Sequence, residues 1–491
     1  MEERISTPAT NNLARSVGRN TIIQFVGKIL GTILGFATSI LLLRYLHVDG
    51  NGAYTTAMAY LGFFSVVADL GLYLILIRDL NKPSADADRI VGNLLALRWL
   101  SAGIILAVGA ASVWFFHFSA AEKVAVLIGT GSYIAIAATQ LLVGVFQSKL
   151  AMKYVTGAEL VGRIVLLSAT WLVINYHGNL SWVMVAVVSS SLVNFILVWW
   201  ASRRFVHVRL RYEREYWLST LRDTLPIAIS IVLNLIYFRA DTIILRLSAG
   251  THDVGLYGAA YKILEILNTF PIMFVGLLLP SLGAAFASND TEGFRRIFQK
   301  GFDLLVMAVI PLLIGGWFLA EPVLVLIGHR EYAPAAPVLR LLLFAVSALF
   351  LGSLSGHVVT IINRQKQMVW SYLSVAVVGV VLYLTLIPRF SLYGAATGTI
   401  ITESLTALVG YILITNVLKF RLRFGVIAKL LLSGIVMWGM MWLTKTTSHW
   451  LAAFSGVIVY IGMLFLTRAL SVQTIRDVIG RQSVVVSTLP E

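Results

Sequence analysis

The sequence predicts an all-α integral membrane protein with about fourteen transmembrane helices. Apolar residues make up 58% of the 491-residue chain and charged residues only 12%, about half the charged fraction of a typical soluble protein. The apolar residues also fall into segments long enough to span a bilayer. Finally, the basic residues gather in alternate links between those segments. Together these patterns exclude a soluble globular enzyme, a fibrous protein and a disordered chain.

The spans are predicted from apolar length, because a helix needs about 20 apolar residues to cross the hydrocarbon core. The fourteen segments that meet this length are residues 20–45, 53–76, 91–115, 124–146, 154–174, 181–201, 224–246, 254–279, 301–320, 334–362, 368–387, 394–416, 428–444 and 450–467. No link between them is long enough to fold as a domain. The tail of residues 1–19 leads into a full-length span, so we expect no removable signal peptide.

The basic residues predict the orientation. With the N-terminus in the cytoplasm, the even-numbered links and the two tails hold 26 of the 38 Lys and Arg, whereas the odd-numbered links hold four. Cytoplasmic links carry such an excess in membrane proteins, so we expect both termini in the cytoplasm. Because this distribution accounts for the net charge of +15, we expect no nucleic-acid partner.

A short internal repeat divides the chain. Gly52-Ala53-Tyr54 begins the second span and Gly255-Leu256-Tyr257 begins the eighth, while Arg44 and Arg246 close the spans before them. Two similar lobes around a central cavity are a common transporter plan. We therefore predict two pseudo-symmetric six-helix lobes and two further C-terminal helices. The predicted parts are a cytoplasmic tail (1–19), an N-lobe (20–201), a basic cytoplasmic linker (202–223), a C-lobe (224–416), spans 13 and 14 (417–467) and a cytoplasmic tail (468–491).

Two regions of the chain resemble a known family. They are Gly27-Lys28, Arg44-Tyr45-Leu46, Gly52-Ala53-Tyr54 and Ala68-Asp69-Leu70-Gly71-Leu72 in the first region, and residues 384–403 with Pro388 and Gly394-Ala395-Ala396 in the second. These stretches resemble the polysaccharide transporter branch, with its O-antigen-type flippases, of the multidrug/oligosaccharidyl-lipid/polysaccharide flippase superfamily. The resemblance implies movement of lipid-linked oligosaccharides from the cytoplasmic to the outer leaflet.

Differences from two other branches of that superfamily indicate which branch this chain resembles. Lipid II flippases typically carry an Arg-Asp pair in the first helix, where this chain has only Lys28. Drug-extruding relatives often use an acidic residue in the first helix, and residues 20–45 contain no Asp or Glu. Both differences favour the oligosaccharide branch.

Charged residues inside spans are the candidate site residues, because such charges are costly in hydrocarbon and usually face a cavity or a partner. Glu159 and Arg163 share one helix face, as do Lys262 and Glu265, so each couple can form either a structural bridge or part of a site. Snorkelling towards the interface is an alternative role for Lys28 and Arg98. For Asp69 we expect a local structural role. Gly27, Gly31 and Gly35 lie on one face of the first span and predict close packing or a bend.

A lipid diphosphate needs cations in place of water around its phosphates. The predicted substrate-binding residues are Lys28, Arg98, Arg163, Arg239 and Lys262 for the phosphates, and Asn234, Tyr237, Tyr257 and Tyr261 for the sugars. The resemblance places spans 1, 5, 7 and 8 around the central cavity. Candidate acids for carrying a proton or sodium counter-ion are Asp241, Glu265 and Glu403.

Two other functions were weighed against the flippase. A cation-coupled multidrug exporter of the same fold is one alternative, and a membrane glycosyltransferase or polymerase is the other. No link has a clustered acidic or histidine motif, and no G-x-x-x-x-G-K-[ST] loop is present. We therefore expect no enzymatic activity, no metal and no cofactor. The predicted partners are a polyprenyl-diphosphate-linked oligosaccharide, membrane lipids and polysaccharide-assembly membrane proteins, in the inner membrane of a prokaryotic cell.

Overall fold

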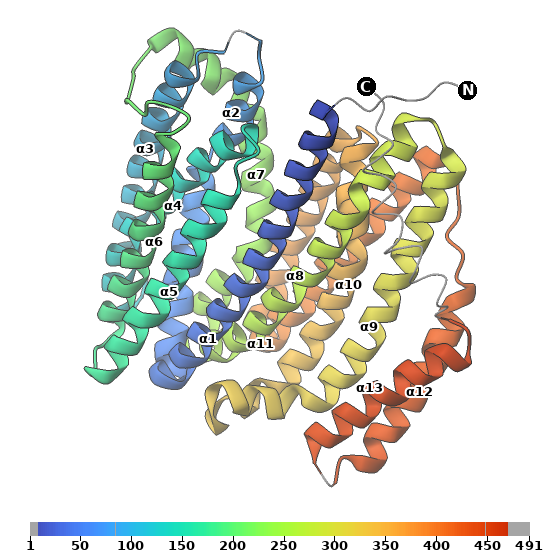
Figure 1. The fold of residues 1–491 in the computed structure, drawn as a ribbon. Helices are drawn as coiled ribbons and strands as arrows, with labels where there is room; N and C mark the ends of the chain where they lie inside the picture. Colours follow the sequence, from blue (N-terminus) through green and yellow to red (C-terminus); the bar gives the residue numbers. More distant parts are fainter. Residues whose placement is uncertain (1–7, 84, 447, 470–491) are drawn as a thin grey trace, which may run out of the picture. The chain divides into compact units, whose positions relative to one another are not determined.

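The computed structural model describes the backbone of residues 8–83, 85–446 and 448–469, and their side chains apart from residues 8–22, 225–239 and 366. Within this part the chain folds into helices and contains no strand (Figure 1). The helices are α1 (Pro8–Val67), α2 (Leu72–Leu80), α3 (Ala87–Ser112), η1 (Val113–Phe115), α4 (Ala120–Ser148), α5 (Lys153–Asn175), α6 (Leu180–Ser202), α7 (Arg214–Ala249), α8 (Thr251–Ala287), α9 (Thr291–Gly328), η2 (Arg330–Ala335), α10 (Ala336–Ile361), α11 (Gln365–Leu418), α12 (Gly425–Thr444) and α13 (His449–Leu466).

The predicted all-α membrane fold is confirmed. Each of the fourteen expected spans falls on helical segments, although the second (53–76) is broken between α1 and α2, and eleven helices in the described part are long and apolar enough to cross a membrane. Two of them contain two expected spans each. α1 turns at His47 (φ 56°, ψ −174°), and α11 turns at Ser391 (φ 49°, ψ −128°). A single residue with positive φ thus reverses the chain between consecutive spans, which is why the sequence shows no separate loop there.

The chain forms two compact units, residues 1–255 and 256–491. The first therefore extends past the linker 202–223, where we expected the N-lobe to end, and includes α7. Arg246 of α7 explains part of this attachment: its Nε lies 2.6 Å from Oε1 of the buried Glu122 at the start of α4. At the other end of α7, Asp223 accepts a hydrogen bond of 2.8 Å from Arg78 of α2. The predicted division into two six-helix lobes around a cavity stays a prediction.

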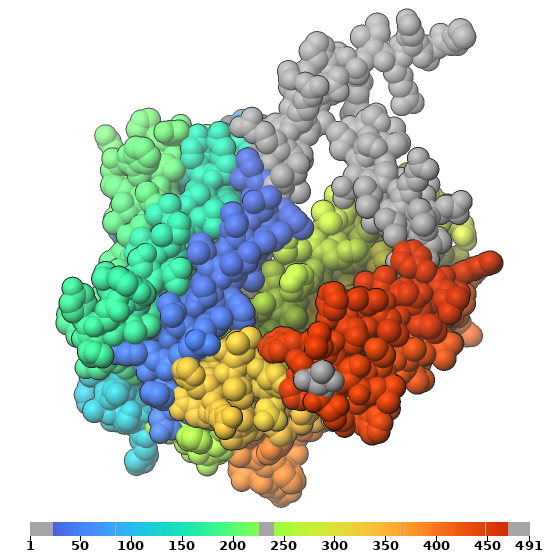
Figure 2. All heavy atoms as spheres, turned by 60° about the horizontal axis from the view of Figure 1, so that its bottom comes forward, coloured from blue at the N-terminus to red at the C-terminus, as the bar shows by residue number. Residues whose placement is uncertain are grey.

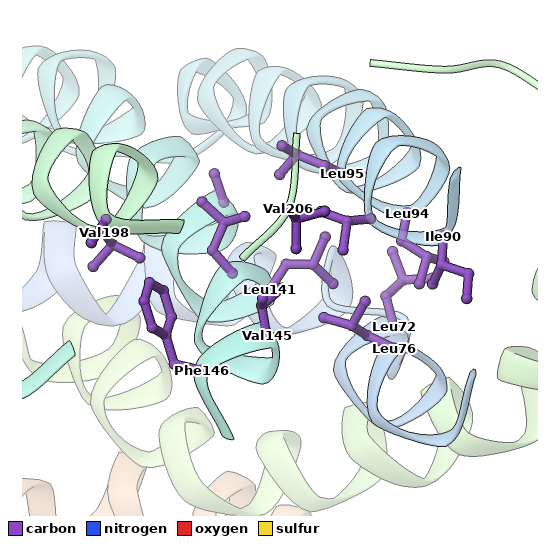
Figure 3. Packing of buried hydrophobic residues seen from close by; sticks show 14 of the residues in the cluster. Leu72, Leu76, Ile90, Leu94, Leu95, Leu141, Val145, Phe146, Val198 and Val206 are labelled. Atoms are coloured by element: carbon purple, nitrogen blue, oxygen red, sulfur yellow. The ribbon is translucent and has the colours of Figure 1, made fainter. Parts of the chain in front are cut away.

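The first unit is held together by a core between its helices. α2, α3, α4 and α6 contribute leucine, isoleucine, valine and phenylalanine side chains, and Val206 of the linker packs among them (Figure 3). The residues labelled there are Leu72, Leu76, Ile90, Leu94, Leu95, Leu141, Val145, Phe146, Val198 and Val206. Because Val206 is 2% exposed, the linker is part of the folded unit.

The repeated glycines lie where two turns meet within the first unit. A Cβ on Gly52 would overlap the carbonyl oxygen of Thr251, and one on Gly255 would overlap that of Val48. Each glycine therefore lets one turn approach the backbone of the other. Nδ2 of Asn51 donates a hydrogen bond of 2.9 Å to the carbonyl of Gly255 at the same place. This reciprocal contact gives the short sequence repeat a structural reason.

The second unit contains the rest of α8 and the helices that follow. The two C-terminal helices, α12 and α13, pack against each other and against α9 (Figure 1). Tyr460 of α13 donates a hydrogen bond of 2.9 Å to the carbonyl of Met307 in α9. Arg295 of α9 bonds the carbonyls of Leu418 and Lys419, which anchors the end of α11. In the described part of this unit, α9 is thus the main helix to which the last two spans are attached.

Candidate functional site

The glycine face of α1 carries the side chain of Arg163. A Cβ on Gly31 would lie 3.2 Å from Arg163 Nε, and one on Gly35 would lie 2.6 Å from Arg163 Nη1. The long side chain of Arg163 therefore lies flat along α1 in space that only glycine leaves open. Gly27 makes the same kind of room for Thr156 of α5. The glycine spacing thus serves packing of α5, and α1 stays helical through these residues.

Arg163 forms an ion pair with Glu159 that remains partly exposed. Its Nη2 donates a hydrogen bond of 3.0 Å to Oε1 of Glu159, one turn earlier on α5, and its side chain remains 35% exposed. α1 and α5 lie side by side at the molecular surface (Figures 1 and 2). A partly exposed pair of this kind contributes little to stability, about 0.2–1 kcal/mol. A phosphate oxygen can therefore replace Glu159 as the partner of Arg163 at small cost.

Lys28 belongs to the same face of α1. It precedes Gly35 by seven residues, which is two helical turns, and Gly31 by three, which makes Gly31 its neighbour. The side chain of Lys28 is exposed, and no carboxylate of the described residues lies within ion-pair distance of it. Arg163 and Glu159 of α5, together with Gly31, Gly35 and the neighbouring Lys28 of α1, are called the α1–α5 site from here on. It presents two cations and one exchangeable carboxylate.

Arg98 has a different environment from the one we predicted for a substrate-binding residue. Its side chain is 1% exposed, and its nitrogens bond the carbonyls of Ala68 (3.0 Å) and Ala137 (3.2 Å) and the side chain of Gln140 (3.1 Å). Oδ1 of Asp69 lies 2.6 Å from its Nη1. Each of its three nitrogens contacts a protein oxygen, so we assign Arg98 a structural role and leave it out of the proposed site.

The role of Arg98 is to stabilise a break in the second span. The helix stops after Val67 and resumes at Leu72, with Leu70 at φ 51° and Gly71 at φ 70°. The carbonyl of Ala68 loses its helical partner there and accepts hydrogen bonds from Arg98 and from Ser101 Oγ (3.0 Å) instead. The expected local role of Asp69 agrees with this arrangement.

The predicted residues of the second unit differ in how open they are. Nζ of Lys262 lies 3.0 Å from Oε2 of Glu265, and both side chains are partly exposed. Tyr257 is fully buried, and its hydroxyl lies 3.2 Å from Thr399 Oγ1. Its ring centroid is 5.6 Å from that of the half-buried Tyr261. Tyr257 therefore supports Tyr261 from the interior, whereas the side chains of Tyr261 and Lys262 are partly exposed.

Two of the three candidate coupling acids are buried: Asp241 in the first unit is 2% exposed and Glu403 in the second is 5% exposed. Asp241 Oδ1 accepts hydrogen bonds from the amide and the hydroxyl of Thr242. The third, Glu265, is partly exposed and lies beside Lys262. The side chains of Asn234, Tyr237 and Arg239 lie outside the described residues.

The α1–α5 contact could not be found by sequence reasoning. The glycine spacing and the Glu159–Arg163 couple were both visible, but nothing in the sequence links residue 35 to residue 163. Gln140 and Ser101, which complete the surroundings of Arg98, were likewise missed, since neither carries a charge. In the described part, no group of three or more His, Asp and Glu side chains could hold a metal ion.

Fold and site together define a multi-pass membrane protein that keeps partly exposed cations inside its spans. A family model described as polysaccharide biosynthesis protein matches residues 17–286, more than half of the chain. The chain therefore belongs to the polysaccharide biosynthesis protein family, which confirms the predicted family. A second family model, described as MatE, matches residues 226–385.

Relatives and solved structures agree with this membership. The succinoglycan biosynthesis transport protein ExoT of Rhizobium meliloti is 23% identical over 68% of this chain and 67% of its own length. The probable flippase AglR of Haloferax volcanii is 22% identical over 79% and 81%. Among solved structures, the lipid II flippase MurJ in an inward closed conformation is 13% identical, covers 91% of this chain and 99% of its own, and has a TM-score of 0.78. An inward-facing multidrug resistance MATE family transporter is 15% identical over 81% and 99%, with a TM-score of 0.62. These relatives are named as transporters or flippases, which agrees with expecting no enzymatic activity.

Proposed function

We propose that this chain is a flippase that moves lipid-linked oligosaccharides from the cytoplasmic to the outer leaflet of a prokaryotic inner membrane by alternating access. The observation that carries the proposal is the α1–α5 site, where Arg163 lies over Gly31 and Gly35 of α1 and Lys28 precedes Gly31 by about one turn of the same apolar span. Cations in such a place are costly unless they meet an anion. A polyprenyl diphosphate supplies about two negative charges on an apolar chain. The name of ExoT, a succinoglycan biosynthesis transport protein, and that of AglR, a probable flippase, support a flippase that acts in polysaccharide biosynthesis.

The proposal is tested with purified protein in liposomes that contain a fluorescent polyprenyl-diphosphate oligosaccharide. Lys28→Gln and Arg163→Gln each lower the initial flipping rate about tenfold, because one charge-assisted contact to phosphate contributes roughly 1.5 kcal/mol. Arg296→Gln, which removes an exposed cation outside the spans, leaves the rate unchanged. Normal rates in both site variants would show that these cations do not bind the substrate.

Counter-ion coupling is part of the proposal, with Asp241, Glu265 and Glu403 as candidate acids for a proton or sodium. Two negative charges moving outward through 100 mV would gain up to about 4–5 kcal/mol. Flipping should therefore respond to an imposed potential without ATP. A rate insensitive to potential, proton gradient and sodium gradient alike would exclude coupling and leave passive downhill flipping.

The orientation is tested separately, since the chain contains no cysteine. We expect Thr251→Cys to react with an impermeant maleimide added to intact cells, and Ser219→Cys to stay unlabelled until the cells are opened. The reverse pattern would place both termini outside.

A drug exporter is the second candidate function, because the MatE match covers residues 226–385. Exporters of cationic drugs need acids where their substrate binds, and the α1–α5 site presents two cations against one carboxylate. Proteoliposomes that extrude ethidium but do not flip the labelled oligosaccharide would favour this alternative.

A further inference from the structure

The linker and the start of α7 form a basic strap, defined here as residues 203–223. The strap runs along the beginning of α3. The backbone amide of His207 donates to Asp88 Oδ1 (2.8 Å), that of Arg211 to the carbonyl of Gly92 (3.2 Å), and that of Glu213 to Asn93 Oδ1 (2.9 Å). A Cβ on Gly92 would overlap the carbonyl oxygen of Arg209, so the strap lies directly on α3.

Two of the three acids of the strap, Glu213 and Asp223, bond to α3 and α2, whereas Glu215 is exposed. Glu213 accepts hydrogen bonds from Arg89 of α3, and Asp223 accepts one from Arg78 of α2. The bonds from Arg89 and Asn93 lower the pKa of Glu213, so its carboxylate stays ionised. Tyr216 of the strap donates a hydrogen bond of 2.9 Å to the buried Asp79 of α2. Burial alone would raise the pKa of Asp79, but the bonds from Lys82, Arg78 and Tyr216 outweigh it and the pKa is lowered.

The arginines of the strap lie at its surface. All six of them are exposed: Arg203, Arg204, Arg209, Arg211, Arg214 and Arg222. Arg211 has Asp86 at 4.0 Å, whereas Arg209, Arg214 and Arg222 have no carboxylate within ion-pair distance among the described residues. The outer face of the strap therefore carries a net positive charge that the protein itself does not neutralise.

Large apolar side chains are interleaved with these arginines. Leu210, Tyr212 and Leu218 are 54%, 68% and 57% exposed. Three such side chains in one short segment contribute no favourable free energy as long as they contact only water. Alternation of arginine with exposed leucine and tyrosine is typical of segments that lie in the interface of a bilayer.

The level of the strap relative to the membrane follows from α6. This helix has 23 residues, about 34 Å, which is enough to cross the hydrocarbon core. Trp199 and Trp200 lie at its end, where tryptophans mark the water–lipid interface. The guanidinium of Arg203 stacks 3.8 Å from the ring of Trp199. The strap thus starts at the level of the lipid headgroups.

We propose that the basic strap is a docking surface for anionic phospholipid headgroups of the leaflet that it borders. Phosphates of such lipids neutralise Arg209, Arg214 and Arg222, while Leu210, Tyr212 and Leu218 enter the interface beside them. An acidic protein could satisfy the arginines, but it would not account for a position next to the tryptophans of α6. The inference depends neither on the transported substrate nor on which side of the membrane the strap occupies.

Native mass spectrometry of the full-length protein in detergent tests lipid binding, with phosphatidylglycerol and phosphatidylcholine as probes. Each basic residue near an anionic surface changes the affinity about five-fold. The triple variant Arg209→Gln/Arg214→Gln/Arg222→Gln should therefore bind phosphatidylglycerol at least tenfold more weakly, and the difference should shrink at high salt. Its matched control, Arg364→Gln/Lys419→Gln/Arg421→Gln, removes the same charge from exposed positions of the second unit. Equal affinity losses in the two triple variants, or no loss in either, would overturn the proposal.

A second measurement locates the strap itself. A nitroxide is attached to Leu210→Cys, the only cysteine in that variant, and the protein is placed in liposomes of phosphatidylcholine with or without phosphatidylglycerol. We expect the label to be reached by oxygen, which partitions into lipid, more than by a water-soluble nickel chelate, and more so with phosphatidylglycerol. A fully water-accessible label in both membranes would exclude lipid as the occupant and leave an acidic protein.

Discussion

Two arginines inside spans of the first unit, Arg98 and Arg163, differ in burial and in the number of their protein partners. Around Arg98, α4 and the broken second span supply two carbonyls, one amide and one carboxylate, and the side chain is 1% exposed. Around Arg163, the glycine face of α1 supplies space but few bonds, and Glu159 is the only carboxylate that a described contact brings to it. The desolvation of Arg98 is compensated within the protein, whereas that of Arg163 leaves room for a ligand. A charge inside a span is therefore a site only where its partners are incomplete.

The largest expected effect comes from removing the buried side chain of Arg98. Arg98→Ala leaves Asp69 without its cation and the carbonyl of Ala68 with one partner fewer. Removing one member of a buried ion pair costs about 3–5 kcal/mol. We expect most of the protein to be lost from the membrane fraction and the remainder to unfold at a clearly lower temperature in detergent.

Arg163→Ala is the control for that experiment and should cost less than about 1 kcal/mol, because the pair it breaks is partly exposed. Equal destabilisation by the two variants would contradict the distinction between the buried Arg98 and the partly exposed Arg163.

A smaller effect follows from neutralising the acid in each region. Asp69→Asn keeps the shape of the side chain but leaves the buried guanidinium of Arg98 without an opposite charge, which should cost about 1–3 kcal/mol. Glu159→Gln should change the thermal unfolding temperature little. Both are measured by thermal unfolding of purified protein in one detergent. If Glu159→Gln were the more destabilising of the two, Arg163 would be the structural residue and Arg98 would need another explanation.

The smallest effect should come from adding a methyl group at Gly35, under the side chain of Arg163. A Cβ at Gly35 would lie 2.6 Å from Arg163 Nη1, so Gly35→Ala must displace the guanidinium. We expect the flipping rate to fall about three-fold while stability hardly changes, because alanine favours the helix by up to about 1 kcal/mol.

Gly157→Ala on α5 is the matched control for Gly35→Ala. No heavy atom lies within 4 Å of a Cβ placed there, so flipping should be unaffected. Flipping by Gly35→Ala at the wild-type rate would show that the position of Arg163 over α1 is not needed for transport.

The outline of the fold was readable because the bilayer imposes it locally. Each span must be about 20 apolar residues long wherever it lies in the chain, so residues 124–146 and 181–201 could be assigned to helices without any knowledge of their neighbours. Turns at His47 and Ser391 did not alter this, since each reverses the chain within one residue. The boundary of the first unit was not readable in this way. It depends on contacts such as Arg246 with Glu122, which join residues 124 positions apart.

The sequence by itself determined the class of protein, the number of spans and the set of charges inside them. Hydrophobic length and charge composition are sums over neighbouring residues, and they need no partner to be read. Only the tertiary structure decided that Arg98 supports a broken helix, while Arg163 lies partly exposed over Gly31 and Gly35 of α1. Whether a buried charge is compensated depends on which groups other helices bring within 3 Å of it, and those helices are specified by packing of the whole unit rather than by the residues beside the charge.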